Sequence, residues 1–330
     1  MDWLTDNKVP IGRAARDAVD WITTNLGWFF DSLSRTLEDG IDALLDQLQS
    51  PDPAIAAGVF AILAYLLTRS LAAGIFALAA GVVLWVTLPR AGLEAPLSVL
   101  DEYAPLTVIA AIVLLAYAMR RSVPIALFAL LGLLLIVNQG YWEETTETLA
   151  LVIAATVACM AIGIPLGIAA ARRDWVYAAL RPVLDLMQTI PTFVYLIPAL
   201  ILFGLGMVPG LIATVIFALP APIRLTRLGI VSTPDALKEA ATAFGASSWQ
   251  RLLKVELPFA RPQILAGLTQ CIMLSLSMVV IAALVGADGL GVPTLRALNT
   301  VNIGMGFEVG LAIVILAIIL DRLFKAEPTR

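Results

Sequence analysis

Histidine is absent from the 330 residues of this sequence, and cysteine occurs only twice. The lack of histidine excludes histidine-based general acid–base catalysis and most zinc sites. The G-x-x-x-x-G-K-[ST] phosphate-binding loop is also missing, so the chain does not hydrolyse ATP by that route. Cys159 and Cys271 both stand inside apolar stretches, which favours two buried thiols over a disulfide. The sequence therefore predicts a protein that is not an enzyme and carries no cofactor or metal ion of its own.

Charge is scarce as well, because Asp, Glu, Lys and Arg make up 14% of the sequence, against about a quarter in soluble globular proteins. Apolar residues make up 60%, and the mean hydropathy is +0.92. From residue 54 onward the chain is a series of apolar runs, and a helix needs about 20 apolar residues to cross a bilayer. The runs cover residues 54–68, 71–88, 105–119, 123–138, 147–170, 183–204, 208–223, 262–286 and 305–321. The sequence thus predicts an all-α, polytopic membrane protein.

The number of spans depends on the first two runs. Only Arg69 and Ser70 separate them, so the two runs either cross separately or form one re-entrant or tilted unit. Basic residues decide the orientation, since cytoplasmic loops carry the excess of Lys and Arg. Loops on one side hold fifteen basic residues and those on the other side six. This predicts an outside N-terminus, a cytoplasmic C-terminus and an odd number of spans, nine or seven.

The first 53 residues differ from the rest, with four basic residues against ten acidic ones. Leucine and isoleucine recur there at steps of three and four, which is typical of an amphipathic helix. The apolar positions are Leu33, Leu37, Ile41, Leu44, Leu45 and Leu48. Such a helix lies on the bilayer or packs on the protein, and its negative charge argues against adhesion to anionic lipid.

The segment 224–261 carries the largest basic group of any loop, so we expect it in the cytoplasm, and within it the sequence predicts two short helices. The Thr-Pro-Asp tripeptide at 233–235 supplies an N-cap, a proline at the first helical position and a first-turn acid. Gly245 is expected to end the first helix. Ser247 and Gln250 form a capping-box pattern that starts the second, and the Leu-Pro pair at 257–258 is expected to stop it.

Each of these short helices has an apolar side. The first presents Leu237, Ala240, Ala241 and Phe244 at helical spacing, and the second presents Trp249, Leu252 and Leu253. Neither helix is long enough to be stable alone in water. An exposed face from Trp249 to Leu253 therefore predicts a protein partner.

The same segment resembles the coupling segment of membrane subunits of ABC importers. That pattern is E-A-A, three residues, G, nine residues, a β-branched residue, any residue, and L-P. Here it is carried by Glu239, Ala240, Ala241, Gly245, Val255, Leu257 and Pro258. Val255 stands where the family often has isoleucine. The resemblance implies that this segment, Trp249 included, inserts into a cleft of a cytoplasmic ATPase subunit, which would hold the ATP and Mg²⁺.

Three further stretches, 184–210, 213–230 and 274–291, resemble the permease subunit of glycine betaine/proline betaine importers. Choline importer permeases are near relatives of that family, and the likeness covers roughly residues 100–325. The runs at 54–88 look like an addition to the usual layout, and Asp288 stands where the family more often has a glycine.

The resemblance implies a type I ABC importer-like transmembrane domain with extra N-terminal helices, in a bacterial cytoplasmic (inner) membrane. Its implied partners are two cytoplasmic ATPases, an external substrate-binding protein docking near residues 287–304, and a second copy of the chain. The expected divisions are an extracytoplasmic segment 1–53, peripheral transmembrane helices 54–138, and a core domain 139–325 that includes the coupling segment 224–261.

Polar residues inside the apolar runs are candidates for lining a transport pathway. Gln188, Thr192 and Tyr195 recur at steps of four and three, so they are expected on one helical face. Proline frees backbone carbonyls, which a membrane tolerates only beside protein or a water-filled cavity, and the run 183–204 has two prolines. The candidates are Gln188, Thr192, Phe193, Tyr195, Ser275 and Ser277. Hydrogen bonding between packed helices is the alternative role, most of all for the serines.

Asp185 stands near the cytoplasmic end of the run 183–204, and an acid inside a membrane indicates function by default. Arg181 lies four residues earlier, so a local ion pair is the alternative. Aromatic faces attract quaternary ammonium groups, and Phe193, Tyr195 and Phe203 are available. A secondary transporter that works alone is the other interpretation of the whole chain. It would need inverted repeats and a buried ion-coupling acid, and the runs hold almost no acids away from their ends.

Overall fold

The computed structural model describes residues 11–50 and 104–325. In these two stretches the regular structure is entirely helical, and the predicted all-α class is confirmed. The N-terminal helix is α2 (Ile11–Gln49), followed after the gap by α6 (Ala104–Arg120) and α7 (Val123–Asn138). The apolar runs 54–68 and 71–88 lie outside the described residues.

The helices from residue 142 onward form the larger part of the described structure. They are α8 (Trp142–Arg172), α9 (Asp174–Thr189), α10 (Thr192–Phe203), α11 (Met207–Ala218), α12 (Pro220–Val231), α13 (Asp235–Ala243), α14 (Ser248–Arg251), α15 (Leu257–Ala282), α16 (Gly291–Asn299) and α17 (Ile303–Phe324). A π-helical turn, Leu252–Glu256, joins α14 to α15, and a 3₁₀ turn, Ala283–Val285, follows α15. Every apolar run predicted after residue 104 falls on helix, and the run 183–204 is divided between α9 and α10.

Four of these stretches are long and apolar enough to cross a membrane, namely Trp142–Arg172, Met207–Val231, Ser248–Val285 and Ile303–Phe324. The pair α9 and α10 would supply a fifth as a broken span. The predicted run 208–223 is short for a span, but the helical stretch that contains it continues through α12 to Val231. α6 and α7 are shorter, with 17 and 16 residues.

The run 183–204 is not one straight helix. α9 and α10 are bent by 100° at the short break between Thr189 and Thr192. Proline disfavours the helical conformation of the residue before it, and Ile190 before Pro191 is accordingly extended, with ψ 131°. The expectation that Gln188, Thr192 and Tyr195 share one helical face is therefore wrong, because the bend separates the first from the other two.

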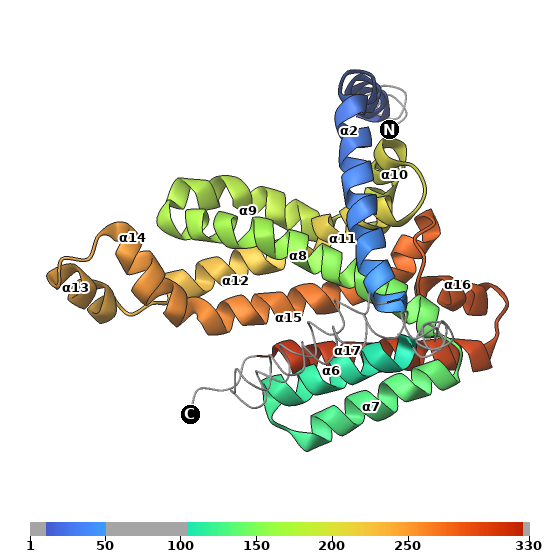
Figure 1. The fold of residues 1–330 in the computed structure, drawn as a ribbon. Helices are drawn as coiled ribbons and strands as arrows, with labels where there is room; N and C mark the ends of the chain where they lie inside the picture. Colours follow the sequence, from blue (N-terminus) through green and yellow to red (C-terminus); the bar gives the residue numbers. More distant parts are fainter. Residues whose placement is uncertain (1–10, 51–103, 326–330) are drawn as a thin grey trace, which may run out of the picture.

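Helices α8, α9, α12 and α15 lie side by side, α2 runs across them, and α13 and α14 lie at one end (Figure 1). α12 packs between α8 and α15, and α9 packs on α8. α6, α7 and α17 form a second group, which joins the first where α17 packs on α15. α13 and α14 project from one end of this bundle, and α16 lies at the other end (Figure 1).

Glycines allow α8, α12 and α15 to approach closely. A Cβ built on Gly163 would lie 2.8 Å from Cγ of Pro222, and one on Gly167 would lie 2.6 Å from Cβ of Thr226. Gly163 and Gly167 are four residues apart, the small-xxx-small spacing that lets membrane helices pack backbone to backbone. From the other side of α12, a Cβ on Gly229 would lie 2.8 Å from Cβ of Ala260 in α15.

The predicted amphipathic helix is α2, and its second half packs on the protein. Ile41 is 1% exposed in a core cluster with Leu151 of α8 and Leu211 of α11. The amide of Gln49 donates a hydrogen bond to the Thr146 hydroxyl at 3.2 Å. Of the two environments left open by the sequence, contact with the protein is the one observed for this half.

Candidate coupling site and transport pathway

The first helix of the predicted coupling segment, α13, ends as the sequence predicts. Gly245 has φ +79°, a left-handed conformation that glycine adopts without strain. Its N–H donates to the carbonyl of Thr242 at 2.9 Å, and the N–H of Ala246 donates to the carbonyl of Ala241 at 3.0 Å. These two bonds are the Schellman arrangement at a helix C-terminus. They turn the chain sharply before α14.

The second helix of this segment, α14, begins with the predicted capping box. The N–H of Gln250 donates to Oγ of Ser247 at 3.2 Å, while the N–H of Ser247 donates to Oε1 of Gln250 at 2.9 Å. Both bonds satisfy backbone donors that a helix start leaves free. The helix end at Gly245 and the capping box at Ser247 thus define the turn between α13 and α14.

Two predicted boundaries of this hairpin are wrong. The N-cap of α13 is Pro234, and the hydroxyl of Thr233 is buried with no hydrogen-bond partner in the described structure. Pro258 does not stop the second helix either, because α14 continues through the π-helical turn into α15. In that turn the N–H of Leu257 donates to the carbonyl of Leu252, five residues earlier. The backbone hydrogen-bond pattern has therefore already shifted before Pro258, which has no N–H to donate.

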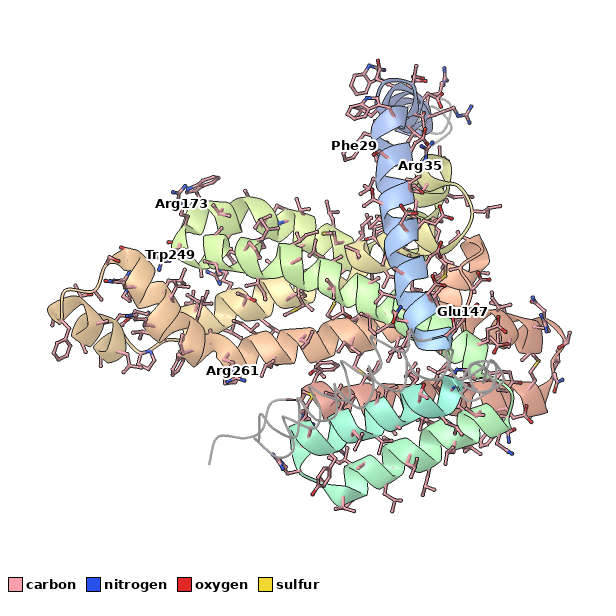
Figure 2. All side chains as sticks on the ribbon, viewed as in Figure 1. Phe29, Arg35, Glu147, Arg173, Trp249 and Arg261 are labelled. Carbon is pink, nitrogen blue, oxygen red and sulfur yellow. The ribbon has the colours of Figure 1, made fainter. Side chains whose placement is uncertain are left out.

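The apolar side chains of the hairpin divide into an anchor and an exposed face. Leu252 is 1% exposed and packs with Ile230 and Ala260. Phe244 is 92% exposed and Trp249 is 64% exposed. The side chains of Glu239, Ala240 and Leu253 are exposed as well. Figure 2 shows Trp249 at the end of the bundle, with Arg261 near the start of α15.

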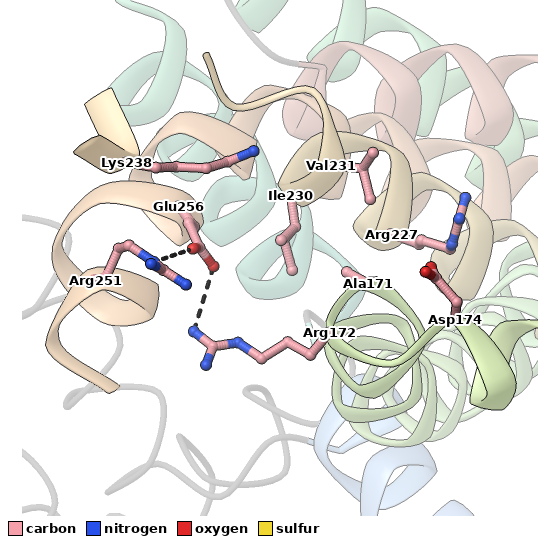
Figure 3. Close-up of a pocket in the computed structure, with 9 residues that line it drawn as sticks. All are labelled: Ala171, Arg172, Asp174, Arg227, Ile230, Val231, Lys238, Arg251 and Glu256. Atoms are coloured by element: carbon pink, nitrogen blue, oxygen red, sulfur yellow. Dashed lines mark hydrogen bonds and ion pairs between the residues drawn. The ribbon is translucent and has the colours of Figure 1, made fainter. Parts of the chain in front are cut away.

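A cleft of about 390 Å³ lies at the base of the hairpin (Figure 3). It is lined by Ala171, Arg172, Asp174, Arg227, Ile230, Val231, Lys238, Arg251 and Glu256. Arg227 also lies over the ring of Tyr177, with its guanidinium carbon 3.6 Å from the ring centroid, a cation–π contact. The lining comes from α8, α9, α12 and the hairpin, so the cleft marks where the hairpin meets the transmembrane helices.

Glu256 is the charged residue that connects this junction, and sequence reasoning missed it. Its Oε1 accepts a hydrogen bond from Nε of Arg251 at 2.9 Å, and its Oε2 accepts one from Nη2 of Arg172 at 3.4 Å (Figure 3). The sequence did offer a signal, because Glu256 is the only acid between Glu239 and Asp288 and stands in the most basic loop.

The bend between α9 and α10 gathers several of the pathway candidates. Arg224 of α12 donates to Asp185 at 2.6 Å and to Oε1 of Gln188 at 2.8 Å. The expected pair of Asp185 with Arg181 is present but longer, at 3.9 Å. Across the bend, the Tyr195 hydroxyl donates to the carbonyl of Leu186 at 3.1 Å. Polar groups thus tie both sides of the break to each other and to α12.

The other pathway candidates lie in different surroundings. Thr192 begins α10, and Phe193 beside it is 56% exposed. On α15, Ser275 is buried at 1% exposure, whereas Ser277 is exposed and donates to the carbonyl of Met273 in its own helix. In the described structure neither serine hydroxyl is hydrogen-bonded to a group at the bend, and their role as pathway residues stays a prediction.

Residues 163–326 match the family model described as "Binding-protein-dependent transport system inner membrane component". The glycine betaine transport system permease protein OpuAB of Bacillus subtilis (strain 168) is 41% identical over 316 residues, which cover 96% of this chain and 93% of that protein. The chain belongs to this family of ABC importer permeases. The predicted family is thereby confirmed.

Other relatives match a shorter part of the permease. The glycine betaine/carnitine transport permease protein GbuB of Listeria monocytogenes is 52% identical over 200 residues, 61% of this chain and 71% of that protein. The glycine betaine/proline betaine transport system permease protein ProW of Escherichia coli (strain K12) is 51% identical over 197 residues, 60% of this chain and 56% of that protein. Of these three relatives, OpuAB matches the largest share of the permease, 96% of its residues.

The fold of the permease also matches a solved ABC importer. A chain from the inward-facing MetNI methionine ABC transporter superposes with a TM-score of 0.51 at 22% identity, over 55% of this chain and 91% of that chain. The transmembrane architecture predicted from the sequence is therefore shown, and the family does not favour a secondary transporter that works alone.

Proposed function

We propose that the permease is the membrane subunit of an ATP-driven importer for glycine betaine, proline betaine or a related quaternary amine. The observation that carries this proposal is the 41% identity to OpuAB over 96% of the chain. GbuB and ProW, whose names also specify glycine betaine, support the same substrate class. The second candidate function is import of choline, which is also a quaternary amine.

ATP hydrolysis belongs, in this proposal, to separate cytoplasmic subunits that dock on α13 and α14. Phe244 and Trp249 would fill an apolar cleft of that partner, because both are exposed while Leu252 beside them holds the hairpin in place. Closure of two ATPases would draw the hairpins of two permease copies together and rock the spans between inward-open and outward-open states. An external binding protein would deliver the substrate on the opposite side.

The expected orientation is an outside N-terminus and a cytoplasmic hairpin, and the two buried cysteines make it easy to test. Cys159 and Cys271 are both 0% exposed, so the natural protein should not react with a membrane-impermeant maleimide. Glu38→Cys on α2 is expected to be labelled in intact cells. Lys254→Cys is expected to be labelled only in inside-out vesicles, and the reverse pattern would contradict the orientation.

Uptake by the reconstituted complex tests the function itself. Proteoliposomes that contain the permease, its ATPase and its binding protein are expected to accumulate radiolabelled glycine betaine only with ATP and Mg²⁺. A non-hydrolysable ATP analogue is the control, and unlabelled proline betaine and choline as competitors rank the substrates. Uptake by the permease alone, driven by an ion gradient without ATP, would refute the proposal.

A further inference from the structure

The carboxylate of Glu256 is the most enclosed charge at the base of the coupling hairpin. Its side chain is only 6% exposed, and each of its two oxygens accepts a hydrogen bond from a different arginine. The arginines are less enclosed, with side chains of Arg172 28% and Arg251 33% exposed. Burying a carboxylate is unfavourable unless it is paired and hydrogen-bonded, so this site depends on both partners.

Arg172 connects Glu256 and the start of α14 to α8. It is the last residue of α8, and its Nη2 donates both to Glu256 and, at 2.7 Å, to the carbonyl of Ser248. Ser248 is the first residue of α14, and Glu256 is the last residue of the π-helical turn. One guanidinium of α8 therefore holds both ends of the segment 248–256, which carries Trp249.

The π-helical turn is the weak point of this connection. From Ser248 to Val285 the chain is helical throughout, 38 residues long. If this helix were rigid, a movement of the hairpin would be transmitted directly to the membrane-spanning part of α15. A π-helical turn interrupts the regular hydrogen-bond ladder and is rare except as single turns, often at functional sites. A force on Trp249 would bend the helix at Leu252–Glu256 unless something fixed that turn from outside.

The other charged groups of the cleft do not serve this purpose. Lys238 pairs with Asp235 in its own helix at 3.2 Å. Arg227 stacks on Tyr177, and within the described part of the chain it makes no ion pair with Asp174 across the cleft (Figure 3). Among the residues that the structure describes, Glu256 is the one acid that joins α8 to the hairpin by an ion pair.

We propose that Glu256 is a positioning residue for energy coupling, and that the Arg172–Glu256–Arg251 clamp fixes the π-helical turn to α8. With the clamp closed, a displacement of the hairpin moves α8 and α15 together. With the clamp open, the displacement is absorbed by the turn, and ATP is hydrolysed without moving the spans. This proposal rests on the proposed function, because it assumes that the hairpin receives the force of an ATPase.

The test is the number of ATP molecules hydrolysed per substrate molecule imported by the reconstituted complex. Glu256→Gln keeps the shape of the side chain and removes its charge. It is expected to raise that ratio at least about fivefold, the lower end of typical coupling between sites, while the ATPase still co-purifies and hydrolyses ATP. Glu38→Gln, an exposed carboxylate on α2, is the matched control and should leave the ratio unchanged.

Arg172→Gln tests whether the effect runs through the clamp. It should raise the ratio as Glu256→Gln does, and the double variant should be no worse than either single one, because residues that act through one contact are not additive. An unchanged ratio in Glu256→Gln would overturn the clamp. So would parallel losses of uptake and hydrolysis that follow only the amount of assembled complex, since a purely structural role predicts that outcome.

The natural complex in the same assay separates the two proposals. ATP-driven import by the natural complex together with an unchanged ratio in Glu256→Gln would overturn the clamp alone. Import by the natural complex without a requirement for ATP would overturn the proposed function and the clamp with it.

Discussion

Replacement of both Phe244 and Trp249 by glutamate is expected to abolish ATP-driven uptake and to release the ATPase from the permease. Both side chains are largely exposed, at 92% and 64%, and a tryptophan at the centre of an interface costs about 2–4 kcal/mol when it is truncated. That loss weakens binding about 30-fold to 1,000-fold, and a buried glutamate charge would weaken it further. Co-purification of the ATPase with tagged permease, followed by uptake, measures both effects.

The control for this prediction is Trp28→Glu. Trp28 is 70% exposed on α2, so it matches Trp249 in residue type and exposure but lies outside the coupling segment. It should retain the ATPase. Full ATPase retention and normal uptake in the Phe244→Glu/Trp249→Glu variant would show that the hairpin face is not the docking surface.

Gly167→Leu is expected to prevent α8 from packing on α12 and to lower the thermal stability of the permease strongly. Already the Cβ would lie 2.6 Å from Cβ of Thr226 and 2.9 Å from the carbonyl oxygen of Ile223, and backbone oxygen cannot move aside as a side chain can. Overpacking costs about 1–3 kcal/mol and sometimes more. Membrane helices associate largely through such close packing, so few other interactions can replace the packing energy lost between α8 and α12. The midpoint of thermal unfolding in detergent, followed by size-exclusion fluorescence, measures the loss.

A matched glycine lies on α17. Nothing lies within 4 Å of a Cβ built on Gly310, so Gly310→Leu makes the same change of residue in open space. Its midpoint should stay close to that of the natural protein. Equal midpoints for Gly167→Leu and Gly310→Leu would mean that the α8–α12 contact is not as tight as the structure shows.

The sequence predicted those parts of the fold that depend on neighbouring residues. Each apolar run predicted after residue 104 falls on helix, because each span must be apolar over its own length, whereas α16 lies outside these runs. The Schellman end at Gly245 and the capping box at Ser247 were also predicted, since each consists of bonds between residues at most five apart. The amphipathic pattern around Ile41 likewise identified the side of α2 that is buried.

Predictions failed where a local rule competed with its surroundings. Proline usually ends a helix, yet the π-helical turn carries the chain past Pro258. Thr233 has the side chain of an N-cap, but it is buried and Pro234 takes that position. The common face of Gln188 and Tyr195 assumed a straight helix, which the 100° bend removes.

The Glu256 clamp could not be derived from spacing at all. Arg172 and Glu256 are 84 residues apart, and no periodic pattern connects two positions whose contact depends on how α8 and α15 pack. The basic loop around Glu256 indicates that it has a cationic partner but does not specify which one. Long-range pairs of this kind become visible only once the helices are placed.

The most direct measurement of the central claim, that the α13–α14 hairpin docks an ATPase, is photo-crosslinking from position 244. A benzophenone amino acid in place of Phe244 is expected to form one covalent product with the ATPase subunit, and the same group at Trp28 should form none. Products with lipid alone, or no product at position 244 although the complex is assembled and active, would contradict the account.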